Sequence, residues 1–391
     1  MMIDPPHAQT MPTGENTTLH DAPNAAGGLI PAARLASADR ILFIAHLALG
    51  DFTYLQNDFR AFAQAYPHLR IDLWIDEVRR TDNPAHWPHL KNYVLYDWAA
   101  GCGLFGRVYR DTYSPALFEQ SVSTAQQEQY PIVVSLATLR PHRYAALARR
   151  IAPRGFVTGV RAHNSWFLPH HLLAYHKLDA SLAEHMVSPT NPQHISSVYA
   201  DMFARLAGVS VPPATRFPFV DIPDRWLAGA AAQLAAWGVN PVLNRLVFIN
   251  PYAKTRKRCW PLQRVSELIR AMQSLPQWKT ASFIINAVPQ ELAEARRFFQ
   301  EHGSPRTELF SAEENFYQLP AMLSQCSLII SVETAVMHLA NAVQVPVIAL
   351  MRQKNPEWVP IDTANSTVIV AARRRDWVKE IAIAPVLEAL P

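Results

Sequence analysis

The sequence of 391 residues contains few cysteines and no long apolar run. Its three cysteines, Cys102, Cys259 and Cys326, are widely spaced and form neither a CxxC pair nor a zinc-binding spacing. So few cysteines in a chain of this length argue against a disulfide scaffold and are typical of a reducing compartment. No window approaches the ~18 apolar residues that a membrane span requires. The first residues, with Asp4 and Glu15, lack the apolar core of a secretory signal. We therefore expect a cytoplasmic protein.

Several motifs of nucleotide and metal chemistry are also missing. The sequence has no GxxxxGK[ST] phosphate loop, no DxD pair to hold a metal–diphosphate complex, and no HExxH or GxSxG. The six histidines between residues 161 and 194 lack a zinc-like spacing with a supporting carboxylate. We expect no metal site and no cofactor.

The charge balance is mild. Lysine and arginine number 36 against 32 acidic residues, which gives a formal net charge of +4. Only 17% of the residues are charged, whereas 49% are hydrophobic, a composition typical of globular domains. This excess of positive charge suits an anionic small ligand or an anionic membrane surface, and we expect no nucleic-acid partner.

The order of apolar segments predicts two α/β domains. Residues 1–38 show no period and are rich in Pro, Ala, Thr, Asn and Gly, which predicts a disordered tail with order beginning at Ile41. Beyond them, apolar runs of strand length alternate with helical patterns. The expected strands are 41–49, 71–76, 131–137, 155–160, 245–251, 281–287, 327–332 and 346–351. The proline-rich segment 209–224 is the best linker, so we expect domains at 39–212 and 213–391, with ligands at the carboxyl ends of the strands.

The first candidate for chemistry is Gly50-Asp51, after the first predicted strand. Glycine allows a sharp turn and close approach of a ligand, and a carboxylate there is suited to take a proton from an attacking hydroxyl. The alternative is that Asp51 only caps the next helix.

The second candidate is the loop from 250 to 261, which carries Lys254, Lys257 and Arg258 between a buried strand and a helix. Cations and free backbone N–H groups at a helix start form an anion site, most often for phosphate. The alternative is a solvated basic loop.

The third candidate is the segment from 331 to 338, where a strand ends and a helix begins. Thr334 and the turn amides are placed to bind phosphate, and Glu333 to meet sugar hydroxyls. His338 lies one helical turn beyond Thr334, so it is expected to face the same site. The alternative is a core histidine and a capping threonine.

Three segments, taken in this order, resemble glycosyltransferase family 9, the ADP-heptose:lipopolysaccharide heptosyltransferases. ILFIAHLALGDFTYLQNDFRAFAQAYP is similar to that family's strand–LGD–helix opening. FINPYAKTRKRCWPLQRVSELI is similar to its HPG…KxWP segment. LPAMLSQCSLIISVETAVMHLANAVQVPVIALM is similar to VDTGxxHLAxAxGxPVVAL and is the most specific of the three. The resemblance covers most of residues 40–391.

The resemblance implies a metal-independent GT-B fold, in which two Rossmann-like domains with parallel sheets face a cleft. The C-terminal domain then binds the nucleotide-sugar donor, and the N-terminal domain binds the acceptor. By position, Asp51 matches the catalytic base and Gly50 its turn on the acceptor side. Arg258 matches a family lysine, and Glu291 resembles the acid that holds the ribose. The acid, hydroxyl and histidine of DTGxxH correspond to Glu333, Thr334 and His338.

This sequence departs from the family pattern at several of these positions. Glu333 replaces aspartate, Ala335 replaces glycine, and Asn250-Pro251-Tyr252 stands at HPG. Arg258 replaces lysine, which exchanges a point charge for a planar fork. These changes keep cations for a phosphate but alter the sugar end of the site.

We therefore expect a glycosyltransferase that moves a heptose-like sugar from a donor such as ADP-heptose to a lipopolysaccharide-core-type acceptor, with inversion. The acceptor is expected to be a lipid-linked saccharide at the inner membrane surface, which the basic residues Arg149, Arg150 and Arg154 would favour. Two alternatives stay open. One is a related transferase with another nucleotide sugar and another glycan or protein acceptor, and the other is a non-catalytic module that only binds a nucleotide.

Overall fold

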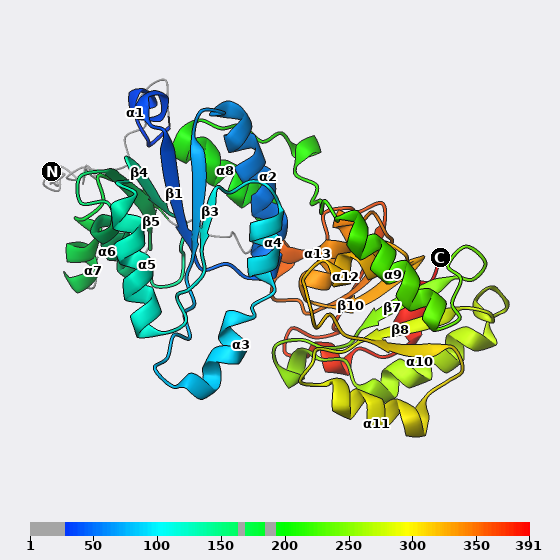
Figure 1. The fold of residues 1–391 in the computed structure, drawn as a ribbon. Coiled ribbons are helices and arrows are strands. Elements are labelled where there is room, and N and C mark those ends of the chain that lie inside the picture. The colour runs from blue at the N-terminus through cyan, green and yellow to red at the C-terminus, as the bar shows by residue number, and fades with distance from the viewer. Residues whose placement is uncertain (1–27, 163–168, 184–192) are drawn as a thin grey trace, which may run out of the picture.

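The computed structural model describes residues 28–162, 169–183 and 193–391. Figure 1 shows two lobes, one built from the N-terminal half of the chain and one from the C-terminal half. Each lobe contains a six-stranded parallel sheet flanked by helices. The α/β class with two Rossmann-like domains, as predicted, is confirmed.

The first sheet has the strand order β3-β2-β1-β4-β5-β6. Its strands are β1 Arg40–Ala45, β2 Arg70–Ile75, β3 Arg107–Tyr109, β4 Ile132–Ser135, β5 Phe156–Arg161 and β6 Ala180–Ala183. The helices of this half are α1 Ala32–Ser37, α2 Leu49–Ala65, α3 Trp87–Lys91, α4 Leu95–Gly101, α5 Pro115–Gln127, α6 Pro141–Ile151, α7 Pro169–Tyr175 and α8 Ile195–Ala207.

The second sheet has the order β12-β11-β10-β7-β8-β9, which repeats the first when read from its other edge. Its strands are β7 Leu246–Asn250, β8 Ser282–Asn286, β9 Thr307–Phe310, β10 Leu328–Val332, β11 Val347–Met351 and β12 Ser366–Val370. The helices are α9 Asp224–Ala236, α10 Leu262–Ser274, α11 Leu292–His302, α12 Gln318–Leu323, α13 Ala335–Ala342 and α14 Ala384–Glu388. In each sheet the strand order reverses beside the first strand, β1 or β7, and a crevice opens at such a switch point.

The 3₁₀ turns are short connections between these elements. They are η1 Pro84–His86, η3 Pro213–Thr215, η4 Arg256–Arg258, η5 Pro276–Trp278, η6 Pro356–Trp358 and η7 Val378–Glu380. The segment 209–223 between the two halves contains only η3. The predicted domain boundary at residue 212 falls within it and stays a prediction.

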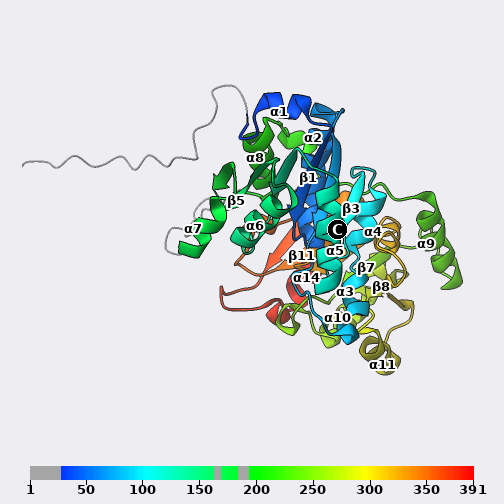
Figure 2. The same cartoon turned by 60° about the vertical axis from the view of Figure 1, so that its left-hand side comes forward.

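The predicted C-terminal boundary of the disordered tail, residue 38, lies too far along the chain. Residues 1–27 lie outside the described residues, but 28–38 pack on the N-terminal domain (Figure 2). Ile30 and Leu35 are each 1% exposed, and the N–H of Ile30 donates to the carbonyl of Leu206 at 2.8 Å. The apolar residues of this short segment show no helical or strand period in the sequence, yet Ile30 and Leu35 each fill a place in the core.

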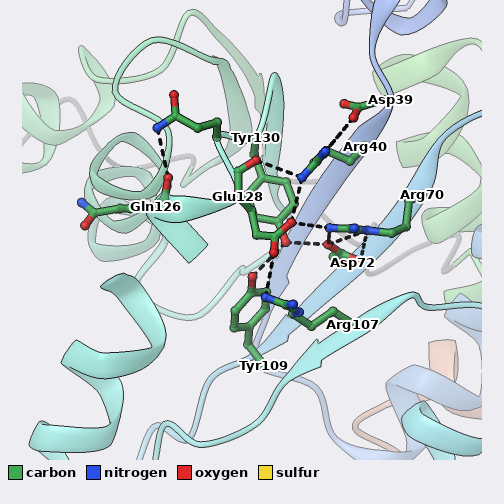
Figure 3. Close-up of polar contacts among 10 residues, drawn as sticks. Asp39, Arg40, Arg70, Asp72, Arg107, Tyr109, Gln126, Glu128 and Tyr130 are labelled. Atoms are coloured by element: carbon green, nitrogen blue, oxygen red, sulfur yellow. Dashed lines mark hydrogen bonds and ion pairs between the residues drawn. The ribbon is translucent and has the colours of Figure 1, made fainter. Parts of the chain in front are cut away.

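The amino end of the first sheet is a closed network of paired charges (Figure 3). Glu128 accepts from three arginines at the starts of β1, β2 and β3, namely Arg40, Arg70 and Arg107, at 2.8, 2.7 and 2.9 Å. The fully buried Asp72 pairs with Arg70 at 2.8 Å. Every charge in this cluster has a partner within the protein, so this end of the sheet is stabilised without a ligand.

Side-chain contacts join the two domains at several places, among them an aromatic stack and a buried hydrogen bond. The rings of Trp98 on α4 and Phe316 stack at 4.4 Å, and the Phe316 N–H donates to Asp97. Between α2 and α13, the Tyr54 hydroxyl lies 2.8 Å from Nδ1 of His338. One apolar cluster therefore contains residues of both domains.

Candidate active site

Asp51 lies at the carboxyl end of β1, in the first turn of α2. Its Oδ2 accepts the Ala48 N–H at 3.0 Å, and its Oδ1 accepts the hydroxyl of Tyr199 on α8 at 2.6 Å. Asp51 therefore does cap α2, because its Oδ2 accepts a backbone N–H that has no partner within the helix. The cap uses only one of its two oxygens, so it does not exclude a catalytic role. Burial raises the pKa of the Asp51 carboxyl, although the bonds from Tyr199 and Ala48 lower it in part. A partly buried carboxylate with a raised pKa is suited to general-base chemistry near neutral pH.

The sharp turn expected at Gly50 is absent. The predicted strand 41–49 ends at Ala45, and Gly50 is the second residue of α2. A Cβ at Gly50 would lie 3.7 Å from Trp358 and 3.8 Å from His338, both in the C-terminal domain. These are ordinary van der Waals distances, so neither a turn nor a close approach of the other domain requires glycine at this position.

His46 follows β1 directly and was not found from the sequence. Its Nδ1 is buried and has no hydrogen-bond partner in the described structure. Burial lowers the pKa of His46, whereas the charges of Asp51 and Asp76 raise it. Its ring stacks on Tyr144 of α6 at 5.8 Å. An imidazole whose Nδ1 has no partner among the described residues therefore lies at this edge of the sheet, within electrostatic reach of Asp51 and Asp76.

A buried amide network joins three strand ends at the switch point of the second sheet. Nδ2 of Asn250, the last residue of β7, donates to the hydroxyls of Ser331 at 3.1 Å and Thr334 at 2.9 Å. Oδ1 of Asn250 accepts from Nδ2 of Asn286, the last residue of β8, at 2.9 Å. Asn286 was missed, although the runs FIN and IIN, each ending a predicted strand in asparagine, signal this edge. The network fixes the turn in which Thr334 precedes α13.

Glu333 is fully engaged by protein groups. Its carboxylate accepts from Arg352 at 2.9 and 3.1 Å, from Arg258 at 3.2 Å and from Asn355 at 3.2 Å, and its side chain is 3% exposed. Arg352, the first residue after β11, was not found from the sequence. The expectation that Glu333 directly meets sugar hydroxyls does not fit this geometry, because the longer glutamate reaches the two guanidinium groups.

At the carboxyl edge of the second sheet, the Nε–H group of Arg258 is a hydrogen-bond donor without an acceptor among the described residues. One of its nitrogens donates to the Glu333 carbonyl at 2.7 Å, which orients the guanidinium. Its Nε is buried and has no hydrogen-bond partner in the described structure. Lys254 and Lys257 are exposed on the same loop, and Nζ of Lys257 lies 5.5 Å from the ring of Trp377. Because a buried N–H without a partner is unfavourable, Arg258 is poised for an acceptor from outside the protein.

Glu291 is the residue before α11 and lies near Tyr252. The Tyr252 hydroxyl is buried and has no hydrogen-bond partner among the described residues. Burial, with the charges of Glu291 and Glu294, raises its pKa. A hydroxyl and a carboxylate that are near each other, one without a partner, suit a polyol such as ribose.

His338 does not face the Thr334 turn. It is 2% exposed, lies against Tyr54 of α2, and burial lowers its pKa to about 3. The core-histidine alternative therefore describes it better, because a neutral imidazole fills the contact between the domains.

Other residues singled out in the sequence are paired, or lie outside the described part. Arg149 pairs with Asp179 at 2.7 Å and Arg150 with Glu119, so they do not form the free basic surface that was expected. His163 and His185 lie outside the described residues. Within 28–162, 169–183 and 193–391, no group of three His, Cys, Asp or Glu residues is placed to hold a metal ion. No helix in the same ranges has the length and apolar character to cross a membrane.

Comparison with known proteins gives one family and one fold. Residues 124–381 match the family model for glycosyltransferase family 9 (heptosyltransferase). The chain is similar to a family 9 glycosyltransferase from Veillonella parvula, with a TM-score of 0.68 and 16% identity, over 90% of this chain and 95% of the other.

Two E. coli structures are also similar. ADP-heptose lipopolysaccharide heptosyltransferase II matches with a TM-score of 0.63 and 15% identity, over 89% of this chain and 96% of the other. A heptosyltransferase with ADP-2-deoxy-2-fluoro heptose matches with a TM-score of 0.58 and 16% identity, over 89% and 98%. No curated protein matches the chain.

Proposed function

Since the chain belongs to glycosyltransferase family 9, and is thus a glycosyltransferase, we propose that it transfers a heptose-like sugar from a nucleoside-diphosphate donor to a saccharide acceptor. The observation that carries the proposal is the buried, unpartnered Nε of Arg258 beside the turn of Thr334. A similar structure holds an ADP-linked sugar analogue, which supports ADP as the nucleotide.

The donor diphosphate is proposed to lie among Lys254, Lys257, Arg258 and Thr334. Thr334 and Ala335 are the half-exposed residues of the turn that begins α13, whereas Glu333 and Val336 on either side are buried. The Thr334 hydroxyl is held by Asn250 and so is preorganised. The free N–H groups at the start of α13 add partial positive charge.

The nucleoside is proposed to lie on the neighbouring side of the same edge, with its ribose between Glu291 and Tyr252. The unpartnered Tyr252 hydroxyl would gain a hydrogen bond from such a ligand. Glu333 serves the donor indirectly, by holding Arg258 and Arg352 in place, and His338 serves it by holding the two domains together.

The transfer step follows from Asp51. As an acceptor hydroxyl attacks the anomeric carbon, its proton passes to the Asp51 carboxylate, and the bond from that carbon to the diphosphate oxygen breaks. Attack from the face opposite the leaving group inverts the anomeric centre. Arg258 and the lysines stabilise the negative charge that develops on the departing diphosphate.

The acceptor and the place of the reaction are part of the same proposal. We propose a lipid-linked, lipopolysaccharide-core-type saccharide, reached from the cytoplasm by peripheral contact with the inner membrane. The replacement of the family aspartate and glycine by Glu333 and Ala335 favours a donor sugar that differs from heptose as the second candidate.

No divalent metal takes part in the proposed mechanism, because cations of the protein face the diphosphate. Activity is expected to persist in excess EDTA. Loss of activity in EDTA with recovery on adding magnesium or manganese would overturn this part of the mechanism.

A panel of nucleotide sugars tests the donor. The true donor at 100 times its Kd should raise the unfolding free energy by about 2.7 kcal/mol, visible as a higher Tm. ADP-heptose is expected to give the largest rise, and a larger rise with another nucleotide sugar would select the second candidate. If no nucleotide sugar changes Tm, the proposal fails.

A further inference from the structure

Positive charge gathers around one aromatic ring of the C-terminal domain. Three cations lie over the ring of Trp377, namely Lys257 at 5.5 Å, Arg352 at 5.1 Å and Lys354 at 5.7 Å. Three consecutive arginines, all exposed, precede this tryptophan by two to four residues. We name this surface the Trp377 patch, and its members are Lys257, Arg352, Lys354, Arg373, Arg374, Arg375 and Trp377. We propose that the Trp377 patch docks on an anionic lipid surface.

Most cations of the Trp377 patch have no anion beside them. Arg352 pairs with Glu333 at 2.9 Å. The other five form neither an ion pair nor a side-chain hydrogen bond with any residue that the structure describes. Asp376 accepts the backbone N–H of Arg373 at 3.1 Å, so this carboxylate serves the loop and not a guanidinium. Positive charge is therefore left on the surface.

The loops that carry the Trp377 patch are held in place from below. Nε2 of Gln353, after β11, donates to the carbonyls of Ala371 and Ala372, after β12, at 2.9 and 3.1 Å. The Trp377 N–H donates to Glu380 at 2.6 Å, and the next residue, Val378, is fully buried. The turn η7 lies against η4, which carries Lys257. The charges are thus presented by a fixed surface.

The Trp377 patch also exposes apolar surface. Trp377 is half-buried, and Val370, the last residue of β12, is 45% exposed. A tryptophan beside lysine and arginine suits the headgroup layer of a membrane, where the indole ring meets the interface and the cations attract anionic lipids. A single-stranded nucleic acid would instead require several rings on which successive bases stack, and this patch has one. The composition therefore favours a lipid surface.

Other groups of arginines in this chain are neutralised by carboxylates. Arg149 pairs with Asp179 and Arg150 with Glu119, which removes the basic surface expected from the sequence. The arginines at the amino end of the first sheet are likewise matched by acidic partners (Figure 3). The Trp377 patch differs because its exposed cations lack such partners. It is therefore the surface that retains a long-range attraction for an anionic membrane.

The position of the Trp377 patch suits the proposed transfer. Arg352 and Trp377 follow β11 and β12, on one side of the Thr334 turn, whereas Glu291 follows β8 on the other side. A membrane against the β11–β12 side leaves the proposed nucleoside site open. It also brings the donor edge close to a lipid-linked acceptor. This use of the patch rests on the proposed function, but lipid binding by the patch does not.

Sedimentation of the full chain with vesicles tests the Trp377 patch. The vesicles contain equal parts of phosphatidylcholine and phosphatidylglycerol, ADP is present in excess, and pure phosphatidylcholine is the neutral control. The Arg373→Gln/Arg374→Gln/Arg375→Gln variant is expected to bind the mixed vesicles roughly a hundredfold more weakly than the wild type. The Arg270→Gln/Arg296→Gln/Arg297→Gln variant loses the same charge from exposed residues of α10 and α11 and should bind as the wild type does.

A variant of the ring separates docking from general attraction of charge. Trp377→Ala keeps every cation and is expected to weaken vesicle binding about tenfold, because an apolar group no longer enters the headgroup layer. Added salt should weaken binding of the wild type. Soluble glycerol phosphate, at the same phosphate concentration as the vesicles, should not displace them, because it lacks the many headgroups of a surface.

Several results would overturn the lipid assignment. They are equal losses in the two triple variants, equal binding to neutral vesicles, no binding to the mixed vesicles, or displacement by glycerol phosphate. Tighter binding of a single-stranded RNA, lost in the Arg373→Gln/Arg374→Gln/Arg375→Gln variant, would also overturn it. Calorimetry with ADP on the same proteins keeps the two proposals apart. A chain that binds vesicles but not ADP would count against the donor site, and one that binds ADP but not vesicles would count against the Trp377 patch.

Discussion

The carboxyl edges of the two sheets have the same topology but satisfy their polar groups differently. At the C-terminal edge, Asn250, Asn286, Thr334 and Glu333 bond to one another or to arginines, and Arg258 Nε is left over. At the N-terminal edge, His46 Nδ1 has no hydrogen-bond partner among the described residues. The C-terminal edge is preorganised for one ligand of fixed shape. In the proposed transfer the donor binds at the C-terminal edge, and the acceptor binds at the N-terminal edge beside Asp51.

The largest expected effect is on turnover at the N-terminal edge. Asp51→Asn removes the base while keeping the shape, so kcat should fall by about 10²–10⁴-fold with ADP affinity unchanged. Asp58→Asn on the same helix is the matched control. Burial raises the pKa of Asp58 to about 8, so this carboxyl is mostly protonated at neutral pH, and kcat should stay near the wild-type value. Wild-type turnover in Asp51→Asn would reduce Asp51 to a helix cap.

The next effect is on stability at the C-terminal edge. Glu333→Gln leaves Arg258 and Arg352 facing a neutral amide, which should lower the unfolding free energy by about 3 kcal/mol. The midpoint of urea unfolding measures the change. Glu291→Gln, half-buried, is the control and should shift stability by less than ~0.5 kcal/mol. Equal midpoints for the two variants would mean that the Glu333 clamp contributes nothing.

The third effect is on ADP affinity and tests the role of Arg258. Arg258→Ala should weaken ADP binding by about 1.5–3 kcal/mol, which is roughly ten- to 150-fold in Kd. Arg270→Ala, an exposed arginine on α10, removes equal charge and should bind ADP normally. Calorimetry on both variants makes the comparison. Unchanged affinity in a folded Arg258→Ala protein would remove the diphosphate from this edge.

A fourth effect, seen only as the pH is lowered, concerns the contact that holds the two edges together. Burial lowers the pKa of His338 to about 3, so below pH 6.5 the unfolded chain takes up a proton that the folded chain does not. Stability should therefore fall as the pH drops from about 6.5 toward 3, by up to about 1.4 kcal/mol per unit. Burial also lowers the pKa of His194, which acts with the same sign.

Urea unfolding at several pH values measures this slope in the wild type and in His338→Asn. The variant should show a shallower slope between pH 4 and 6.5, roughly by the contribution of one histidine. His302→Asn, an exposed histidine, should keep the wild-type slope. A slope unchanged in His338→Asn would show that this imidazole is not the group that resists protonation.

The sequence predicted the centre of each sheet better than its edges. The eight expected strands correspond to β1, β2, β4, β5, β7, β8, β10 and β11, which are buried on both faces and form continuous apolar runs. The four missed strands, β3, β6, β9 and β12, are the edges of the two sheets. They are three to five residues long and partly exposed, and no continuous apolar run marks β3, β6 or β9. The run 368–372 does mark β12, but no strand was predicted there.

The candidate site was predictable where one short segment carries it. The Thr334 turn and the basic loop each follow a predicted strand, so topology alone brought them to one edge. Contacts between distant residues could not be read in this way. Tyr199 reaches Asp51 across 148 positions and Arg352 reaches Glu333 across 19, and neither pair forms a pattern along the chain. For the same reason the position of His338 was predicted wrongly. Its helical spacing from Thr334 does not reveal that α2 packs against it.

The most direct test of the division between the two edges is amide hydrogen exchange with and without ADP. If the donor binds as proposed, ADP should slow exchange in residues 252–262 and 333–340, because it contacts the basic loop and the start of α13. Residues 137–147, which follow β4 and begin α6 at the carboxyl edge of the N-terminal sheet, should exchange at the same rate in both states. Protection confined to 137–147, or none at 252–262 and 333–340 with ADP bound, would contradict the account.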